Sequence, residues 1–334
     1  MNILITGAGL IGCHFAREMG LHGHQAVIYD LAPMEPYVRS VAGDVPVVKG
    51  DVRDLPALMD VIREHRVEAV FHSAGLIGPR VAEHPYTGLS INVGGAIAVG
   101  EACRLSGVRR LVFASSFAVY NWDLPPAAPI DEDFPTTQNT FYGGSKVACE
   151  QILRAYASTY GLELALLRFA QVYGRGHYVG GSSGGIAMHG VVETASRAEP
   201  VRIDPRHFGI NEYVYIEDVV QGLAMAFERP LVSRAFNIGT GVLHSPADVA
   251  EALRRACPGL QVEVLPGPAQ RPGQRRDQPL DLTRARRELG YNPRFDLTRG
   301  IAAFVEELRR RARGQGSGVK GQGSRPPMTL HPKP

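Results

Sequence analysis

The chain has 334 residues, of which 44% are hydrophobic and 21% are charged, as in ordinary globular proteins, so collagen-like, coiled-coil and wholly disordered chains are excluded. The length allows about two domains. The formal net charge of +3 comes from the carboxyl end, because the residues from Arg309 onward include seven basic side chains and no acidic one, and we therefore expect no nucleic-acid partner.

Short apolar runs alternate with helical patterns through the first half of the chain. The sequence predicts strands at 2–6, 25–30, 45–49, 69–73, 110–115 and 163–169. It predicts helices at 10–21, 55–66 and 141–160, and another long helix that ends near Ser106. Nearly continuous apolar strands separated by helices are typical of a parallel sheet covered on both faces. We therefore predict an α/β fold with a doubly wound parallel sheet.

The pattern becomes less regular after Gly174. The glycine-rich segment 176–185 is predicted to be a mobile loop. Strands are expected at 213–216, 235–238 and 261–265, with helices at 217–229 and 246–256. We interpret this part as a smaller lobe at the carboxyl edge of the sheet. The predicted division is a dinucleotide-binding domain at 1–174 with elements returning near 211–240, a substrate-binding lobe at 175–312 and a disordered tail at 313–334.

The cysteines and the first residues indicate where the protein works. Four scattered cysteines include no C-x-x-C pair, as expected of reduced thiols. The opening residues MNILITGAG lack the basic segment and the longer apolar run of a signal peptide. No stretch approaches the roughly 20 apolar residues of a membrane helix. We therefore expect a cytoplasmic protein without a membrane partner.

The motif TGAGLIG follows the first predicted strand and opens a helix. Its glycines, Gly7, Gly9 and Gly12, have G-x-G-x-x-G spacing, and Leu10 and Ile11 lie between the last two. Glycines allow a tight turn that brings backbone N–H groups against a pyrophosphate, and the helix N-terminus adds partial positive charge. A simple glycine turn is the alternative, but the position after the first strand favours dinucleotide binding.

Asp30 ends the second predicted strand, 18 residues after Gly12. A carboxylate there accepts hydrogen bonds from the adenosine ribose and repels a 2′-phosphate, which favours NAD over NADP. A turn-forming aspartate is the alternative interpretation. Further candidates for cofactor contact follow the next two strands: Asp51, Val52, Ser73, Ala74 and Gly75.

A tyrosine and a lysine stand four residues apart in YGGSK, near the start of a predicted helix. Tyr142 and Lys146 therefore share one helix face. An ammonium and the positive ring of NAD⁺ favour the phenolate of Tyr142, which can take a substrate proton while Lys146 holds the nicotinamide ribose. Ser115 and Ser116 end the preceding strand, where a hydroxyl can bind the same substrate oxygen. A solvated lysine is the alternative, but the chain has four lysines against 32 arginines.

Several motifs between residues 1 and 310 match one known family. They are TGAGLIG at 6–12, GDVRD at 50–54, NVGG from Asn92, SSFAVY at 115–120, YGGSK at 142–146, LRFAQVYG at 167–174, YVYIEDV at 213–219, FNIGTG at 236–241 and LGYNP at 289–293. On these residues the chain resembles the extended short-chain dehydrogenase/reductases, the NAD-dependent epimerase/dehydratase family. The resemblance implies a Rossmann domain, a substrate lobe, a homodimer, a role in carbohydrate metabolism and Ser-Tyr-Lys chemistry. It places the catalytic serine at Ser116 and adds Asn92 to the cofactor-binding residues.

Departures from the family pattern bear on the substrate. The glycine loop is one residue shorter than the family's usual G-x-x-G-x-x-G. Phe117 and Ala118 stand where dehydratases of the family have an Asp-Glu pair, so we expect no dehydratase. Gln171 replaces a common asparagine of nucleotide-sugar enzymes, and Asn211 replaces an arginine that binds the substrate diphosphate. Arg271 is the candidate for a second such arginine, with a solvated basic loop as the alternative.

Two reactions share the same first step at this motif. A dehydrogenase releases the ketone or lactone and NADH, whereas an epimerase returns hydride to the other face of the sugar. The altered diphosphate positions favour a smaller sugar, a sugar acid or a polyol, with a UDP-sugar 4-epimerase as the alternative. A non-catalytic NAD-binding sensor is an alternative of another class, which the presence of both Tyr142 and Lys146 disfavours. The histidines have no metal-ligand spacing, so no metal is expected.

Overall fold

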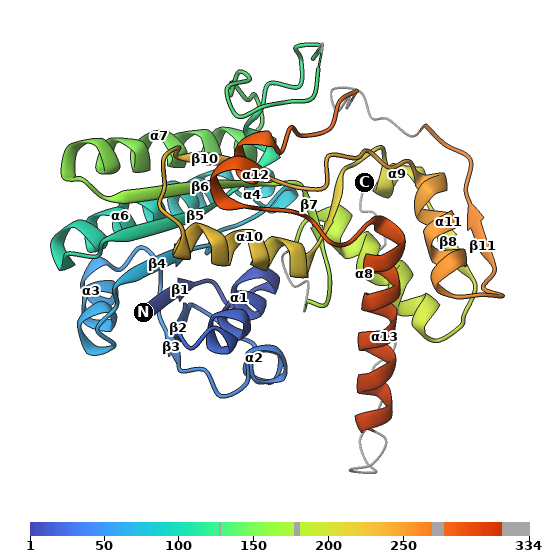
Figure 1. Ribbon diagram of the computed structural model, residues 1–334, viewed down its shortest axis with the longest axis horizontal. Coiled ribbons are helices and arrows are strands. Elements are labelled where there is room, and N and C mark those ends of the chain that lie inside the picture. Colours follow the sequence, from blue (N-terminus) through green and yellow to red (C-terminus); the bar gives the residue numbers. More distant parts are fainter. Residues whose placement is uncertain (127, 177–180, 269–276, 316–334) are drawn as a thin grey trace.

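The computed structural model describes residues 1–126, 128–176, 181–268 and 277–315, and its centre is a parallel sheet of seven strands (Figure 1). The strand order is β10-β6-β5-β4-β1-β2-β3. These strands are β1 (Asn2–Thr6), β2 (Gln25–Asp30), β3 (Val47–Lys49), β4 (Ala69–His72), β5 (Arg110–Ser116), β6 (Glu163–Phe169) and β10 (Ala235–Ile238). The strand order reverses between β1 and β4, so their carboxyl ends form the switch point where ligands bind in open α/β sheets. The predicted doubly wound fold is confirmed.

Helices cover both faces of the sheet because successive strand residues point to opposite sides. Ile3 and Ile5 of β1 belong to a core that contains Phe15, whereas Leu4 between them belongs to a second core that contains Leu58. The first core is covered by α1 (Leu10–Leu21), α2 (Glu35–Ala42) and α10 (Ile216–Glu228). The second is covered by α3 (Leu55–Glu64), α6 (Gly95–Ser106) and α7 (Phe141–Tyr160).

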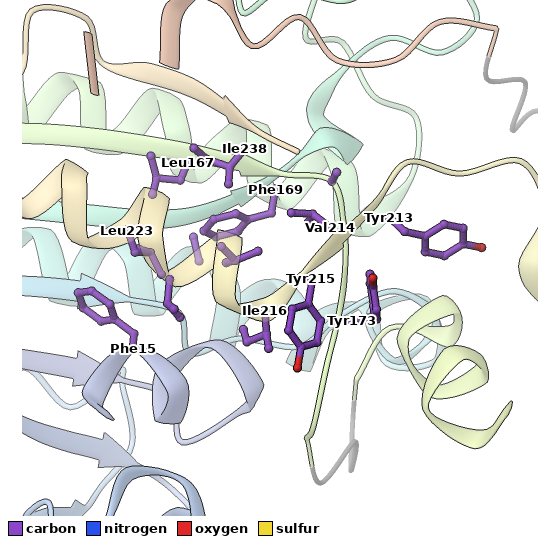
Figure 2. Packing of buried hydrophobic residues seen from close by; sticks show 14 of the residues in the cluster. Phe15, Leu167, Phe169, Tyr173, Tyr213, Val214, Tyr215, Ile216, Leu223 and Ile238 are labelled. Carbon is purple, nitrogen blue, oxygen red and sulfur yellow. The ribbon is translucent and has the colours of Figure 1, made fainter. Parts of the chain in front are cut away.

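A smaller lobe continues from the first core at the carboxyl edge of the sheet. It holds β7 (Gln171–Tyr173) paired with β9 (Tyr213–Tyr215) and β8 (Val201–Ile203) paired with β11 (Val262–Val264). Its helices are α8 (Ser183–Ser196), α9 (Pro205–Phe208), α11 (Pro246–Ala256) and α13 (Leu297–Gln315). Figure 2 shows Phe169 of the main sheet beside Val214, with Tyr173 and Tyr215 farther along the same core. The lobe and the sheet therefore share one apolar interior.

The remaining described elements are short. They are α4 (Pro79–Glu83), α5 (Pro85–Leu89), a π-helical turn at Ser90–Gly94, a 3₁₀-helix at Phe117–Val119 and α12 (Thr283–Leu289). Within the residues that the structure describes, no helix is both long and apolar enough to cross a membrane.

Some sequence predictions about loops and ends were wrong. The predicted loop 176–185 overlaps α8, which begins at Ser183 because the Ser182 side chain accepts a hydrogen bond from the backbone N–H of Gly185. The predicted tail 313–334 begins too early, because α13 continues to Gln315. Residues 177–180 of the loop and 316–334 of the tail lie outside the described residues. The predicted strand 45–49 is shortened to Val47–Lys49.

Candidate active site

Glycine is required for a different structural reason at each of the three positions after β1. Gly7 has a φ of +100°, and a Cβ there would lie 2.9 Å from the backbone nitrogen of Ala74. A Cβ on Gly12 would lie 2.0 Å from the carbonyl oxygen of Gly7. A Cβ on Gly9, by contrast, would have no heavy atom of the described residues within 4 Å. The first and third glycines therefore close the turn, and Gly9 leaves space beside the helix.

The N-terminus of α1 meets this space. Within the described residues, Gly9 supplies no side-chain cap to the helix, and the first turn has no acidic residue. The first N–H groups of the helix are therefore available to an external acceptor, and the helix dipole favours an anion there. Leu10 and Ile11, which begin α1, provide these groups at the position predicted for a pyrophosphate.

Asp30 lies beside the glycine loop, as expected. Its Oδ2 accepts a hydrogen bond from the backbone N–H of Ala8 at 2.8 Å, and its Oδ1 accepts one from the N–H of Ala32 at 2.8 Å. These contacts fix the carboxylate at the end of β2. Each carboxylate oxygen has more than one lone pair, so both can still accept hydrogen bonds from a ribose.

Asp51 and Val52, which follow β3, make contacts with other residues of the protein. The carboxylate of Asp51 binds the guanidinium of Arg53 at 2.6 Å, and the hydrogen bonds from Arg53 lower the pKa of that carboxyl. The side chain of Val52 is buried, and a Cβ on Gly95 would lie 2.7 Å from its Cγ1. Val52 therefore packs against α6, and only the backbone and the exposed part of Asp51 are left for the predicted adenine contact.

Asn92 fixes the segment that follows β4. Its Nδ2 donates to the carbonyl oxygen of Leu76 at 3.1 Å and to Oγ of Ser145 at 3.1 Å, while its Oδ1 accepts from the N–H of Leu76 at 2.8 Å. The side chain is 3% exposed and lies in the π-helical turn. We expected a cofactor contact, but both amide hydrogens are used within the protein, so the side chain of Asn92 positions the loop.

The loop Ser73-Ala74-Gly75 is also held against β1. The hydroxyl of Ser73 donates to the carbonyl oxygen of Thr6 at 2.7 Å. The backbone nitrogen of Ala74 lies 2.9 Å from where a Cβ on Gly7 would be. A Cβ on Gly75 would lie 2.9 Å from Oδ1 of Asn92. The loop therefore lies next to the glycine turn, as its predicted cofactor role requires.

Tyr142, Lys146 and Ser116 come together at the carboxyl end of β5. Helix α7 begins at Phe141 because the side chain of Thr140 accepts a hydrogen bond from the N–H of Gly143, which places Tyr142 in the first turn. Ser116 ends β5, and its hydroxyl lies close enough to the phenol of Tyr142 to lower the pKa of that phenol. The ammonium of Lys146 lies 6.0 Å from the centre of the Tyr142 ring.

Lys146 is held by the strand beneath it. Its Nζ donates to the carbonyl oxygen of Ala114 at 2.7 Å and lies 4.5 Å from the centre of the Phe113 ring. The side chain is 7% exposed, and burial lowers the pKa of Lys146 while the neighbouring Cys149 and Glu150 oppose this change. The ammonium is therefore fixed in direction toward β5.

The pKa of Tyr142 differs from our expectation. Burial raises the pKa of its phenol to about 12, and the hydrogen bond with Ser116 offsets only part of this increase. Lys146 does not lower this pKa, contrary to our expectation. The protein's own groups therefore keep Tyr142 protonated at neutral pH, so an added positive charge is required to make the phenol a base.

The two serines at the end of β5 point to different partners. The hydroxyl of Ser115 donates to Oε1 of Glu150 at 2.6 Å, whereas the hydroxyl of Ser116 lies near Tyr142. Ser115 is thereby used inside the protein and is not brought to the phenol, contrary to our prediction of a substrate contact. Sequence analysis missed Glu150, although its position eight residues after Tyr142 places it on the same helix face.

The predicted substrate residues lie at the edge of the smaller lobe. Nε2 of Gln171 donates to Oγ of Ser182 at 2.8 Å, at the N-terminus of α8. Asn211 pairs through its backbone with His244, and its side-chain amide donates to the carbonyl oxygen of Phe208. Both side chains are engaged within the lobe, and Arg271 lies outside the described residues.

Glu212 is a buried carboxylate that sequence analysis missed. Its Oε1 accepts from the N–H groups of Thr240 at 2.7 Å and Gly241 at 2.9 Å, and its Oε2 accepts from Leu280 at 2.8 Å. It lines a small pocket with six other residues, namely Phe117, Trp122, Ala170, Leu243, Gln278 and Leu280. The pocket has a volume of about 10 Å³, which is room for about one water molecule and not for a sugar. Among the described residues, no group of His, Cys, Asp or Glu is arranged to hold a metal ion.

The chain is similar over most of its length to known proteins. The model of the NAD dependent epimerase/dehydratase family matches residues 3–239. A UDP-glucose 4-epimerase of Mycolicibacterium smegmatis is 32% identical, over 93% of this chain and 100% of its own length. The UDP-glucose 4-epimerase of Thermotoga maritima with UDP-glucose has a TM-score of 0.81 at 27% identity and covers 93% of this chain and 100% of its own. That of Thermus thermophilus in complex with NAD has a TM-score of 0.80 at 29% identity, over 92% of this chain and 99% of its own.

Proposed function

Since the chain belongs to the NAD-dependent epimerase/dehydratase family, we propose that it is an NAD-dependent UDP-sugar 4-epimerase. The observation that carries the proposal is the meeting of Ser116, Tyr142 and Lys146 at the edge of the sheet where the glycine loop also lies. The names of the curated and structural relatives supply the substrate class.

The residues at the switch point fit NAD. The space over Gly9 and the N-terminus of α1, which no side chain of the described residues caps, suit a pyrophosphate. Asp30 at the end of β2 suits the hydroxyls of the adenosine ribose, and its negative charge disfavours the 2′-phosphate of NADP. The loop Ser73-Ala74-Gly75 would line the route between this end and Tyr142. When bound, NAD⁺ accepts hydride from the substrate carbon and its reduced form returns it.

Tyr142 is the proposed acid and base. Its phenol would take the proton of the sugar hydroxyl in the oxidation and return a proton after the oxidised sugar has turned. Ser116 would bind the same sugar oxygen, because its hydroxyl lies at the phenol. Lys146, fixed by Ala114, would contribute positive charge near the phenol and hold the nicotinamide ribose. The positive charge that Tyr142 needs to ionise below a pKa of about 12 would come from the nicotinamide ring.

A second candidate function is the oxidation of a smaller sugar or sugar acid with release of NADH. The observation that favours it is the use of Gln171 and Asn211 within the lobe. Gln171 binds Ser182 and Asn211 binds Phe208, so neither amide is aimed at a diphosphate. Neutral side chains also attract a diphosphate less strongly than arginine does. This candidate predicts NADH accumulation, which an epimerase does not produce.

The deciding experiment is a substrate screen with the NAD-loaded protein. UDP-glucose, UDP-galactose, free sugars and sugar acids are each incubated with it, and both NADH absorbance and product configuration are recorded. Inversion at carbon 4 of a UDP-sugar without NADH accumulation is the expected result. NADH formed in proportion to product would overturn the epimerase in favour of the dehydrogenase. A Tyr142→Phe variant should lose turnover while it retains NAD.

We also propose that the protein is a cytoplasmic homodimer. The four free cysteines are all buried, which suits a reducing compartment. Helices α6 and α7 pack side by side and leave Ile97, Leu105 and Tyr160 exposed at their outer surface. Apolar side chains gathered on two adjacent helices favour association with a second copy. A Leu105→Arg substitution should shift the sedimentation of a dimer toward that of a monomer, and a wild-type monomer at all concentrations would contradict the proposal.

A further inference from the structure

Glu150 continues a series of contacts that tie α7 to the end of β5. Tyr142, Lys146 and Glu150 follow one another at intervals of four residues and therefore line one face of the helix. The first two contact Ser116 and the Ala114 carbonyl, as described above. Three successive residues of β5, 114 to 116, are thus bound by three successive turns of α7.

The third contact of this series joins Glu150 to Ser115. The hydroxyl of Ser115 donates to Oε1 of Glu150 at 2.6 Å, and the carboxylate side chain is 2% exposed. Ser115 immediately precedes Ser116 in the same strand. A shift of Ser115 relative to α7 would therefore move the Ser116 hydroxyl relative to the Tyr142 phenol.

Arg168 of β6 binds Glu150 from the other side. Its Nε donates to Oε1 at 2.9 Å and one terminal nitrogen donates to Oε2 at 2.7 Å, and the Arg168 side chain is 3% exposed. Ser115 and Arg168 are direct partners in the parallel pairing of β5 and β6. Glu150 consequently spans two neighbouring strands at one level, which fixes α7 along both of them.

The guanidinium of Arg168 is itself held in place. Its remaining terminal nitrogen donates to the hydroxyl of Tyr120 at 3.2 Å and to the carbonyl oxygen of Glu132 at 2.8 Å. Tyr120 in turn donates to Oδ1 of Asn237 in β10 at 2.6 Å. A buried ion pair whose remaining donors are satisfied in this way has one well-defined geometry.

We propose that Glu150 is a positioning residue for the reaction: it fixes Ser116 through its hydrogen bond with Ser115. The proposal rests on the proposed function, because it concerns the same three side chains. Reacting groups that are misplaced by about 1 Å lose up to about a hundredfold in rate, so a contact that removes such movement raises kcat. Substrate and NAD are bound by other residues, so their affinity should depend little on Glu150.

Several titratable groups surround Lys146 and must be considered together. On α7 these are Tyr142, Cys149 and Glu150, and on β4 it is His72, whose pKa burial and Lys146 lower to about 3. His72 and the Cys149 thiol are therefore neutral near pH 7, since burial raises the pKa of Cys149 to about 11. Glu150 is the neighbouring carboxylate that supports the charge of Lys146.

Ser115→Ala tests the contact with the smallest change. It removes the hydroxyl and leaves the Glu150–Arg168 pair intact. We expect kcat to fall about tenfold with KM and NAD content unchanged. In NAD-loaded protein, the ultraviolet titration of Tyr142 should move to higher pH, measured as the difference between each protein and its Tyr142→Phe counterpart. An unchanged kcat together with an unchanged titration would overturn the proposal.

Ser233→Ala is the matched control. The hydroxyl of Ser233 also donates to a glutamate, Oε1 of Glu288 at 2.9 Å, but it lies before the amino end of β10, away from the site. Both variants should lower thermal stability, Ser115→Ala more so because its hydrogen bond is buried and that of Ser233 is partly exposed. Only Ser115→Ala should lower kcat and move the Tyr142 titration. If Ser233→Ala has the same effects on both, the contact of Ser115 has no special role.

Glu150 itself is tested together with its partner. Glu150→Gln alone would leave the Arg168 charge buried without a carboxylate, which prevents stable folding in many proteins. The double variant Glu150→Met with Arg168→Met removes both charges and the acceptor of the Ser115 hydroxyl. A folded double variant should lose at least as much of kcat as Ser115→Ala, and a wild-type kcat would contradict the positioning role.

The two proposals fail in different ways. If the wild-type protein inverts no UDP-sugar in the screen, the proposed function is wrong. The Tyr142 titration requires no substrate, so the effect of Ser115→Ala on it still decides whether the Glu150 contact positions the phenol.

Discussion

The ammonium of Lys146 is bound by the carbonyl oxygen of Ala114 at 2.7 Å, and β5 rather than Tyr142 therefore sets its position. A buried ammonium needs such an acceptor because its transfer from water is costly. The contact also keeps the charge 6.0 Å from the centre of the Tyr142 ring.

Lys146→Met should lower kcat about a hundredfold while the protein remains folded, because the aliphatic side chain fills the space but removes the charge near the reacting proton. Turnover is measured with the substrate found in the screen, and circular dichroism reports folding. Lys146→Arg should not restore activity, since a planar guanidinium is larger than the ammonium in this buried site. Recovery by arginine would show that charge alone is sufficient.

Gly9→Ala should weaken NAD binding about tenfold or more without loss of stability. A Cβ on Gly9 meets no heavy atom of the described residues within 4 Å and the residue has a φ of −83°, so alanine fits the backbone but occupies the space assigned to the pyrophosphate. NAD affinity by calorimetry and thermal unfolding are the two measurements.

Gly12→Ala is the matched comparison for that variant. A Cβ there would lie 2.0 Å from the carbonyl oxygen of Gly7, so we expect a lower unfolding temperature in addition to weaker NAD binding. Equal unfolding temperatures of the two alanine variants would contradict the conclusion that Gly12 has no room for a Cβ and Gly9 has.

Asp30→Ala should weaken NAD binding and reduce discrimination against NADP. The change removes the acceptor for the ribose hydroxyls and the charge that repels a 2′-phosphate. It also removes the hydrogen bond that the N–H of Ala8 donates to the carboxylate at 2.8 Å, so we expect a modest loss of stability. The ratio of the two dissociation constants is the measurement, and an unchanged ratio would reject the ribose assignment.

His14 should make the protein sensitive to acid. Its ring is 1% exposed, its Nε2 lies 3.0 Å from the carbonyl oxygen of Arg175, and burial lowers its pKa from 6.5 to about 3. The folded state therefore favours the neutral ring, so this stabilisation is complete above pH 6.5 and is lost as the pH falls toward 3.

The test is a comparison of wild type with His14→Gln, whose amide can still donate to Arg175 but does not titrate. Denaturant unfolding at pH 7 and at pH 5 should show a smaller loss of unfolding free energy in the variant. An equal loss in both proteins would assign the acid sensitivity to other groups.

Several elements were predicted from the sequence with their observed bounds. Helix Phe141–Tyr160 is one of them, because Thr140 caps its start and Gly161, with a φ of 72°, ends it. Strand Glu163–Phe169 and helix Pro246–Ala256 are others, since their apolar periodicity and flanking residues agree. Helix α8 was missed because its first turn is Ser-Gly-Gly, which favours a loop locally and becomes helical through the cap of Ser182 and packing in the lobe.

The sequence by itself determined the spacing of the residues proposed for cofactor binding and catalysis. These are the three glycines after the first strand, and the tyrosine and lysine one helical turn apart. Those features depend on local rules of turn and helix geometry. The tertiary structure decided the partner of Ser115 and that Glu150 joins Ser115 to Arg168. Ser115 and Arg168 are 53 residues apart in the sequence, and only the pairing of β5 with β6 brings them to one level, because strand register is set by packing across the whole sheet.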